Sequence, residues 1–128
     1  MTKEELIARN KKFVIEVLNL MESLPNNRTD DALVRLLVRS SSSVGANYRA
    51  ACRVKSTADF INKLKIVEEE ADESSYFIEL LHDIDQNDNK EKMKVLLKES
   101  NELQLLSIYS ASIITMKNKV IVTKNCTS

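Results

Sequence analysis

Apolar residues recur every three to four positions in four stretches of the chain, and short polar breaks separate these stretches. Such spacing is typical of amphipathic helices, which turn one face to a core and the other to water. The pattern predicts helices over about residues 3–24, 30–54, 56–84 and 90–119. Residues 120–128 are rich in β-branched side chains without a partner strand, so we expect a flexible C-terminal tail there.

The breaks contain residues that end and begin helices. Pro25 ends the first helix, because proline disfavours helical conformation in the residue before it. Thr29 or Asp30 can cap the second helix, and Ser56 can cap the third, by accepting hydrogen bonds from first-turn N–H groups. The polar run Asp85–Asn89 forms the last break.

Short connections determine how the four helices are arranged. A few residues cannot carry the chain back along a helix about 35 Å long, so consecutive helices must be antiparallel neighbours. The predicted fold class is therefore all-α, an up-down-up-down antiparallel four-helix bundle in one domain. Composition agrees, because one glycine and one proline in 128 residues are too few for the turns of a β-sandwich or barrel.

The predicted helix over 30–54 is rich in small residues and places one amide near the core. On a helical wheel its inner face contains Leu33, Leu37, Ser40, Val44, Asn47 and Ala51. A buried amide needs partners, so we expect Asn47 to have a structural role, bonded to a backbone carbonyl or to a side chain on a facing helix.

No catalytic or metal site is apparent. A di-iron bundle needs two Glu-x-x-His pairs, and Glu79 with His82 supplies one, but His82 is the only histidine. The two cysteines, Cys52 and Cys126, have no ligand spacing, and there is no phosphate-binding loop, nucleophile elbow or zinc motif. We therefore expect no catalytic residue, no cofactor and no metal.

The length of the apolar stretches and the character of the N-terminal segment indicate where in the cell the protein is found. No stretch of 18 consecutive apolar residues occurs, and the segment Met1–Arg9 is charged and amphipathic, unlike a secretory signal. We expect a cytoplasmic protein that does not enter a membrane.

Three segments carry a family resemblance: Ser43–Ala51 (SVGANYRAA), Lys55–Glu73 (KSTADFINKLKIVEEEADE) and Tyr76–Leu81 (YFIELL). They resemble the bacterial four-helix-bundle family known as the 23S rRNA-intervening sequence proteins, over about residues 5–118. Many relatives carry glutamate at the position of Ala50. The resemblance implies a cytoplasmic bundle that assembles as a ring, typically a pentamer. It also implies kinship with the accessory protein of diversity-generating retroelements, a pentameric basic barrel that binds nucleic acid and a reverse transcriptase.

The predicted topology separates the charges of a neutral chain. Lys+Arg and Asp+Glu both number 19, yet the end holding both termini gathers residues 1–13, 45–66 and 105–128. These segments contain twelve basic and three acidic side chains, a net charge of +9, which leaves −9 at the other end. The end with a net charge of +9 would attract polyanions. The candidate nucleic-acid-binding residues are Arg9, Lys12, Arg49, Arg53, Lys55 and Lys119.

Binding of RNA or DNA at this end would be sequence-independent, because no side-chain pattern suits contacts with base edges. The alternative is that the charge split is screened surface chemistry. The protein would then be a structural or protein-interaction ring with an unknown protein partner. The neutral total and the lack of aromatic residues placed for base stacking favour this alternative.

An arginine stripe adds a second question about charge. Arg35, Arg39, Arg49 and Arg53 fall within about 80° on the wheel of the second predicted helix. The stripe either is a solvated face or forms ion pairs with the acidic stretch of the third helix, or it contacts phosphates or a neighbouring subunit.

The third predicted helix has more apolar surface than one bundle requires. Besides its main apolar face it carries a second stripe, and a lone bundle needs only one stripe per helix. We therefore expect a homo-oligomer, with a pentamer favoured by the resemblance. The candidate subunit-interface residues are Ile66, Tyr76, Phe77, Leu80 and Leu81.

Overall fold

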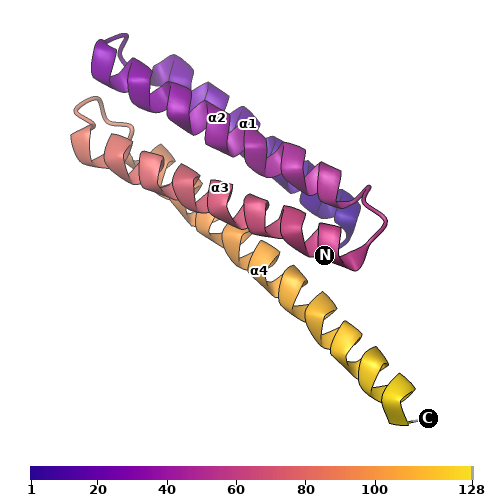
Figure 1. Ribbon diagram of the computed structural model, residues 1–128. Coiled ribbons are helices and arrows are strands. Elements are labelled where there is room, and N and C mark those ends of the chain that lie inside the picture. Colours follow the sequence, from indigo (N-terminus) through magenta and orange to yellow (C-terminus); the bar gives the residue numbers. More distant parts are fainter. Residues whose placement is uncertain (128) are drawn as a thin grey trace.

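Four antiparallel helices form a bundle (Figure 1). The structure, a computed structural model, describes the backbone of residues 1–127 and the side chains of residues 1–117. Within this part of the chain there is no strand, and the elements are α1 (Lys3–Ser23), α2 (Arg28–Ala51), α3 (Thr57–Ile84) and α4 (Lys90–Thr127). The all-α, up-down-up-down fold expected from the sequence is thus confirmed.

Polar side chains cap the first three helices. Thr2 and Glu5 form a reciprocal capping box at the start of α1, and Ser56 accepts a hydrogen bond from the Asp59 N–H at the start of α3, as predicted. The cap of α2 is Asn27, which accepts from the Asp30 N–H at 2.8 Å, and neither Thr29 nor Asp30 takes this role. Asparagine is as good a cap as aspartate, and its place before Arg28 starts the helix slightly earlier than predicted.

Two helices end more than one residue away from their predicted C-terminal boundaries. The second helix ends at Ala51 instead of 54, and α4 continues to Thr127 instead of ending at Lys119. The backbone of 120–127 is thus helical where a tail was expected, whereas the flexibility of this segment stays a prediction, and Ser128 lies outside the described residues. β-Branched residues lower helix propensity by only tenths of a kcal/mol each, and α4 contains no glycine or proline to stop it. As a result α4 extends well past the other three helices (Figure 1).

The helices do not pack evenly around the core. The third helix packs extensively against both α2 and α4, whereas α1 rests mainly on α2 and contacts α4 only lightly. Among the described residues, the backbones of the diagonal pairs, α1 with α3 and α2 with α4, nowhere bring Cα atoms within 8 Å of each other. The largest fully buried side chains include Phe13, Leu37, Leu64, Ile78, Leu81, Met93 and Leu103. Each contributes about 1.5–3 kcal/mol through its removal from water.

Small polar residues line the close seams of α3. Ser74 donates a hydrogen bond to the Ser40 hydroxyl of α2 at 2.8 Å. On the other side, Ser75 lies 2.8 Å from the Ser100 hydroxyl and 2.9 Å from Asn101 Oδ1, both on α4. These pairs explain why α2 and α3 carry serines at buried positions, since short side chains let the helices approach and their hydroxyls find partners.

The buried face of α2 is rotated slightly from the predicted one. Ser40 and Val44 are buried as expected, but Tyr48 is also buried, and Asn47 lies at the edge of this face, half-exposed. The larger apolar area of tyrosine explains the rotation. The Asn47 amide donates to the Ser43 carbonyl at 2.9 Å and to the Ser43 hydroxyl at 2.8 Å. Its predicted bond to a backbone carbonyl is confirmed, within its own helix and not across to a facing one.

None of the helices described combines the length and apolar character that would let it cross a bilayer.

Candidate functional site

The segments predicted to form the basic end do come together. The start of α1, the end of α2, the start of α3 and the C-terminal half of α4 share one groove, to which Leu6, Tyr48, Phe60 and Leu106 each contribute. Every one of the three segments with surplus positive charge has residues in this groove. The antiparallel topology therefore places the basic segments at one end of the bundle.

Three of the six candidate nucleic-acid-binding residues are free at this end. Arg49, on the last turn of α2, and Arg53 and Lys55, in the connection to α3, are all exposed. Among residues 1–117, none of these three side chains lies within 4.0 Å of a carboxylate oxygen. Their charges are therefore available to a ligand in solution.

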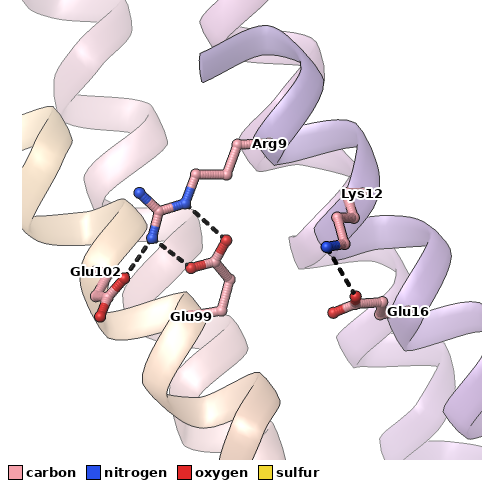
Figure 2. Close-up of polar contacts among 5 residues, drawn as sticks. All are labelled: Arg9, Lys12, Glu16, Glu99 and Glu102. Atoms are coloured by element: carbon pink, nitrogen blue, oxygen red, sulfur yellow. Dashed lines mark hydrogen bonds and ion pairs between the residues drawn. The ribbon is translucent and has the colours of Figure 1, made fainter. Parts of the chain in front are cut away.

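Two other candidates, Arg9 and Lys12, have partners within the chain (Figure 2). Arg9 Nε lies 2.8 Å from Glu99 Oε2 and its Nη2 lies 2.6 Å from Glu99 Oε1, while Nη2 also contacts Glu102. The hydrogen bonds with Glu99 raise the pKa of Arg9 above its already high value, against the effect of partial burial. Two carboxylates thus surround one guanidinium, and Arg9 links α1 to α4. Sequence reasoning missed this link.

Lys12 is more loosely held. Its Nζ lies 3.9 Å from Glu16 Oε1 one turn further along α1, and the lysine side chain is largely exposed. The sixth candidate, Lys119, lies outside the residues whose side chains the structure describes.

Among the described side chains, the arginine stripe of α2 does not form the direct ion pairs that were one of its interpretations, and its exposure agrees with a solvated face. Arg35, Arg39, Arg49 and Arg53 are all exposed, and within the described side chains none is within 4.0 Å of a carboxylate. One arginine of the stripe, Arg39, does act on a carboxylate of α3 through its charge, without a direct contact. Burial and the neighbouring Glu73 raise the pKa of Glu70 on α3, and the charge of Arg39 partly lowers it.

The groove at the basic end has a volume of about 300 Å³ and mostly apolar walls. Tyr48 forms part of the groove and is 5% exposed, and burial raises its pKa to about 12, with smaller contributions from Cys52 and Glu4. The phenol is therefore neutral at all physiological pH values. Tyr109 also lines the groove but is 64% exposed.

Tyr109 corrects the expectation that no aromatic residue is placed for base stacking, because it lies at the basic end with most of its surface open to solvent. It belongs to an exposed apolar stripe on α4 that also contains Leu105, Ile108 and Met116. The spacing of three to four residues in this stripe was present in the sequence. Apolar residues on the core face of the same helix, such as Leu103 and Leu106, hid it by making the stretch apolar almost all round.

Four of the five candidate interface residues on α3 are accessible, and one is not. Ile66 and Tyr76 are exposed, Phe77 and Leu80 are half-buried, and the rings of Tyr76 and Phe77 are 5.9 Å apart. Leu81, at 1% exposure, belongs to the core of the bundle, so its assignment to a subunit interface is wrong. It follows Ile78 by three residues and shares that residue's inward face.

The acidic and histidine side chains of residues 1–117 form no candidate metal site. Within the described part of the chain, no group of three or more His, Cys, Asp and Glu side chains is placed to hold a metal ion. His82 Nδ1 lies 3.4 Å from its sequence neighbour Asp83, and the buried Nε2 has no hydrogen-bond partner among the described residues.

Comparisons with known proteins agree on the family. The family model for the 23S rRNA-intervening sequence protein matches residues 3–108. A crystal structure of a protein of unknown function from the S23 ribosomal protein family of Bacteroides thetaiotaomicron is similar, with 33% sequence identity and a TM-score of 0.76. The similarity covers 90% of this chain and 99% of that one. No protein with a curated description matches. The resemblance carried by the stretch from Ser43 to Leu81 is confirmed, and the chain belongs to the 23S rRNA-intervening sequence protein family.

Proposed function

We propose that this protein is a non-enzymatic accessory protein that binds RNA or DNA, without sequence preference, through the basic end of its bundle. The observation that carries the proposal is the exposed cluster of Arg49, Arg53 and Lys55, whose charges have no carboxylate partner within 4.0 Å among the described side chains. These residues lie where the three basic segments meet. Arg9 contributes little to this surface, because Glu99 and Glu102 already compensate its charge.

Binding would come from contacts with phosphates. Each arginine or lysine that neutralises a phosphate releases condensed counterions, so affinity falls steeply as salt rises. Contacts with the backbone carry no sequence information. A surface of exposed cationic side chains therefore suits binding that does not depend on the nucleotide sequence.

We include assembly in the proposal, as a homo-oligomer with five subunits favoured by the family resemblance. Exposed apolar residues on two helices support it: Tyr76 on α3, and Leu105 and Met116 on α4. In a cyclic ring all subunits point the same way, so their basic ends would lie on one face and their charges would add. A cytoplasmic location belongs to the same proposal, and the free thiol of Cys52 suits a reducing compartment.

The test is a binding titration with charge-reversal variants. Random-sequence RNA and DNA oligonucleotides are titrated by fluorescence anisotropy at 50, 100 and 200 mM salt. We expect the double variant Arg49→Glu, Arg53→Glu to weaken binding by at least about tenfold and to reduce the salt slope. The matched control is Arg28→Glu with Lys92→Glu, which makes the same charge change at exposed positions of the acidic end and should alter binding little.

One specific observation favours a second function. The apolar stripe on α4 suits a protein partner better than a polyanion, because large exposed apolar patches mark protein interaction sites. If the wild-type protein binds no oligonucleotide at tens of micromolar in 50 mM salt, the nucleic-acid proposal is wrong and a protein-interaction ring takes its place.

A further inference from the structure

The groove at the basic end combines apolar walls with an open aromatic face. Its lining consists of Met1, Lys3, Leu6, Tyr48, Phe60, Leu106, Tyr109, Ser110, Ile113 and Ile114. Its volume of about 300 Å³ is at the lower end of the range for small-molecule clefts. A ligand group bound there would contact apolar side chains on several sides and the ring of Tyr109.

One cationic side chain lines this groove, and two others are close in sequence to its lining residues. Lys3 is part of its lining, and Arg53 and Lys55 lie in the connection between the two helices that supply Tyr48 and Phe60. The acidic side chains nearby are those of Glu4, Glu5 and Asp59, of which Glu5 is engaged with the backbone N–H of Thr2 in the capping box.

An occupant that satisfies both features has a flat, weakly polar part and a negative charge. An inorganic anion would leave the apolar walls unused, and an uncharged apolar group would leave the cations unused. A nucleotide has both parts, an aromatic base and a phosphate, joined at a distance of a few ångströms.

The exposure of Tyr109 indicates whether a single strand or a duplex is the better ligand. Stacking of bases on aromatic side chains is tolerant of sequence, because every base has a π-face. Bases inside a duplex are already stacked on one another, whereas a single strand can turn a base outward to a protein surface. An exposed tyrosine beside cationic side chains therefore discriminates between single strands and duplexes without reading sequence.

We infer that the basic end binds single-stranded nucleic acid in preference to duplex, with one base stacked on Tyr109 at the rim of the groove and adjacent phosphates near Lys3, Arg53 and Lys55. This inference rests on the proposed function and specifies its ligand. Val95, 63% exposed on the same helix but near the acidic end of the bundle, offers a control. Like Tyr109 it is an exposed apolar residue of α4, and it is not part of the lining of the groove.

The experiment compares three probes of equal length at 100 mM salt by fluorescence anisotropy, using the full chain. The probes are a mixed-sequence single strand, its duplex, and a single strand whose central nucleotides are abasic, which keeps the phosphates and removes the bases. We expect the wild-type protein to bind the intact single strand at least about fivefold more tightly than the abasic strand.

Variants assign the effect to one ring. Tyr109→Ala should weaken binding of the intact single strand by at least about fivefold while leaving duplex and abasic binding and the salt slope unchanged. Tyr109→Phe keeps the stacking face and should restore wild-type affinity. Val95→Ala should bind all three probes as the wild type does. Circular dichroism and light scattering on each variant verify the same helix content and the same subunit number.

The outcomes separate this inference from the function on which it rests. Equal binding of single strand, abasic strand and duplex, with no effect of Tyr109→Ala, overturns the stacking inference and leaves the proposed function standing. Absence of binding to every probe overturns both. If Tyr109→Ala lowers the subunit number and weakens all probes equally, Tyr109 belongs to a contact between subunits and the inference is wrong.

Discussion

Arg9 on α1 and Glu99 on α4 form a two-bond ion pair, with Nε 2.8 Å from Oε2 and Nη2 2.6 Å from Oε1. Glu102 approaches the same guanidinium from the next turn of α4 (Figure 2). The pair joins the two neighbouring helices that contact each other least. Because the backbones of α1 and α4 approach each other at few positions, this partly buried pair has a large share in fixing their relative position.

Arg9→Ala should therefore destabilise the protein. The variant removes three charge-assisted contacts and leaves two carboxylates close together, each without its partner. We expect a loss of about 1–3 kcal/mol in the free energy of unfolding, measured by thermal and urea melts. Lys12→Ala is the control, because Lys12 forms only an exposed contact with Glu16 and should change stability by less than about 0.5 kcal/mol. A melt for Arg9→Ala that overlays the wild type would show that the pair does not hold α1 to α4.

Replacing Gly45, the only glycine in the sequence, should stabilise the protein. Gly45 lies inside α2, and a Cβ added there would be 3.6 Å from the Asn10 Cβ, an ordinary contact distance. Because glycine costs about 1 kcal/mol relative to alanine within a helix, Gly45→Ala should raise the free energy of unfolding by up to about that amount. Gly45→Leu, whose longer side chain must displace Asn10 or turn outward, should gain less or lose stability. Destabilisation by alanine would show that α1 and α2 are closer than this distance implies.

The sequence predicted correctly the features that depend on local properties of the chain, and less well those that depend on packing between helices. Helical periodicity and the Pro25 and Ser56 boundaries gave the fold correctly, because each is a local property that tertiary contacts did not override. The end of α4 was wrong because β-branched residues are weak helix breakers and no stronger one follows them. Leu81 was misplaced because a wheel shows that two stripes exist but not how wide the buried sector of the helix is.

The candidate site was predicted less completely than the fold. The predicted topology alone indicated that the three basic segments lie at the same end of the bundle. The groove that these segments share agrees with this prediction. Pairing of Arg9 with Glu99, 90 positions away, depends on the rotation of two helices about their own axes. That rotation is fixed by side-chain packing across the whole bundle, which one sequence does not reveal. Exposure of Tyr109 has the same origin, because the rotation of α4 about its axis decides which of its apolar residues face the core.

Glu70 makes stability depend on pH in a direction that can be tested. Burial and repulsion from Glu73 raise its pKa above 4.5, so the ionised form is disfavoured in the folded state. The stabilisation that its proton provides is complete below the unfolded-state pKa and is lost as pH rises through the higher folded-state value. Glu70→Gln cannot ionise and should be more stable than the wild type at pH 7, by less than about 1 kcal/mol because the side chain is only partly buried and water screens its charge.

This advantage of Glu70→Gln should disappear below about pH 4, where the wild-type carboxyl is protonated as well. Melting temperatures measured between pH 3 and pH 8 test the prediction. Glu79→Gln, which removes a charge from an exposed position on the same helix, serves as the control. An advantage of Glu70→Gln that stays constant over the whole range would exclude the titration of Glu70 as its cause.

The two classes of apolar residue on α3 should respond differently to substitution. Tyr76 and Phe77 lie on the accessible stripe, whereas Leu81 is in the core. If the stripe forms a subunit interface, Phe77→Asp places a charge in a desolvated contact and should lower the mass measured by light scattering to that of a monomer, 14.6 kDa. Tyr76→Asp should act in the same direction. Asn62→Asp adds the same charge at an exposed polar position of α3 and should leave the mass unchanged.

Leu81→Ala should act on the fold instead of the assembly. Truncation of a fully buried leucine costs about 2–5 kcal/mol through lost burial and a residual cavity. We expect a lower melting temperature, measured at a concentration where the subunit number equals that of the wild type. The comparison is decisive because both effects are measured on one helix. If Phe77→Asp and Tyr76→Asp keep the wild-type mass, the accessible stripe of α3 is not the contact between subunits, and the exposed stripe of α4 becomes the surface to mutate next.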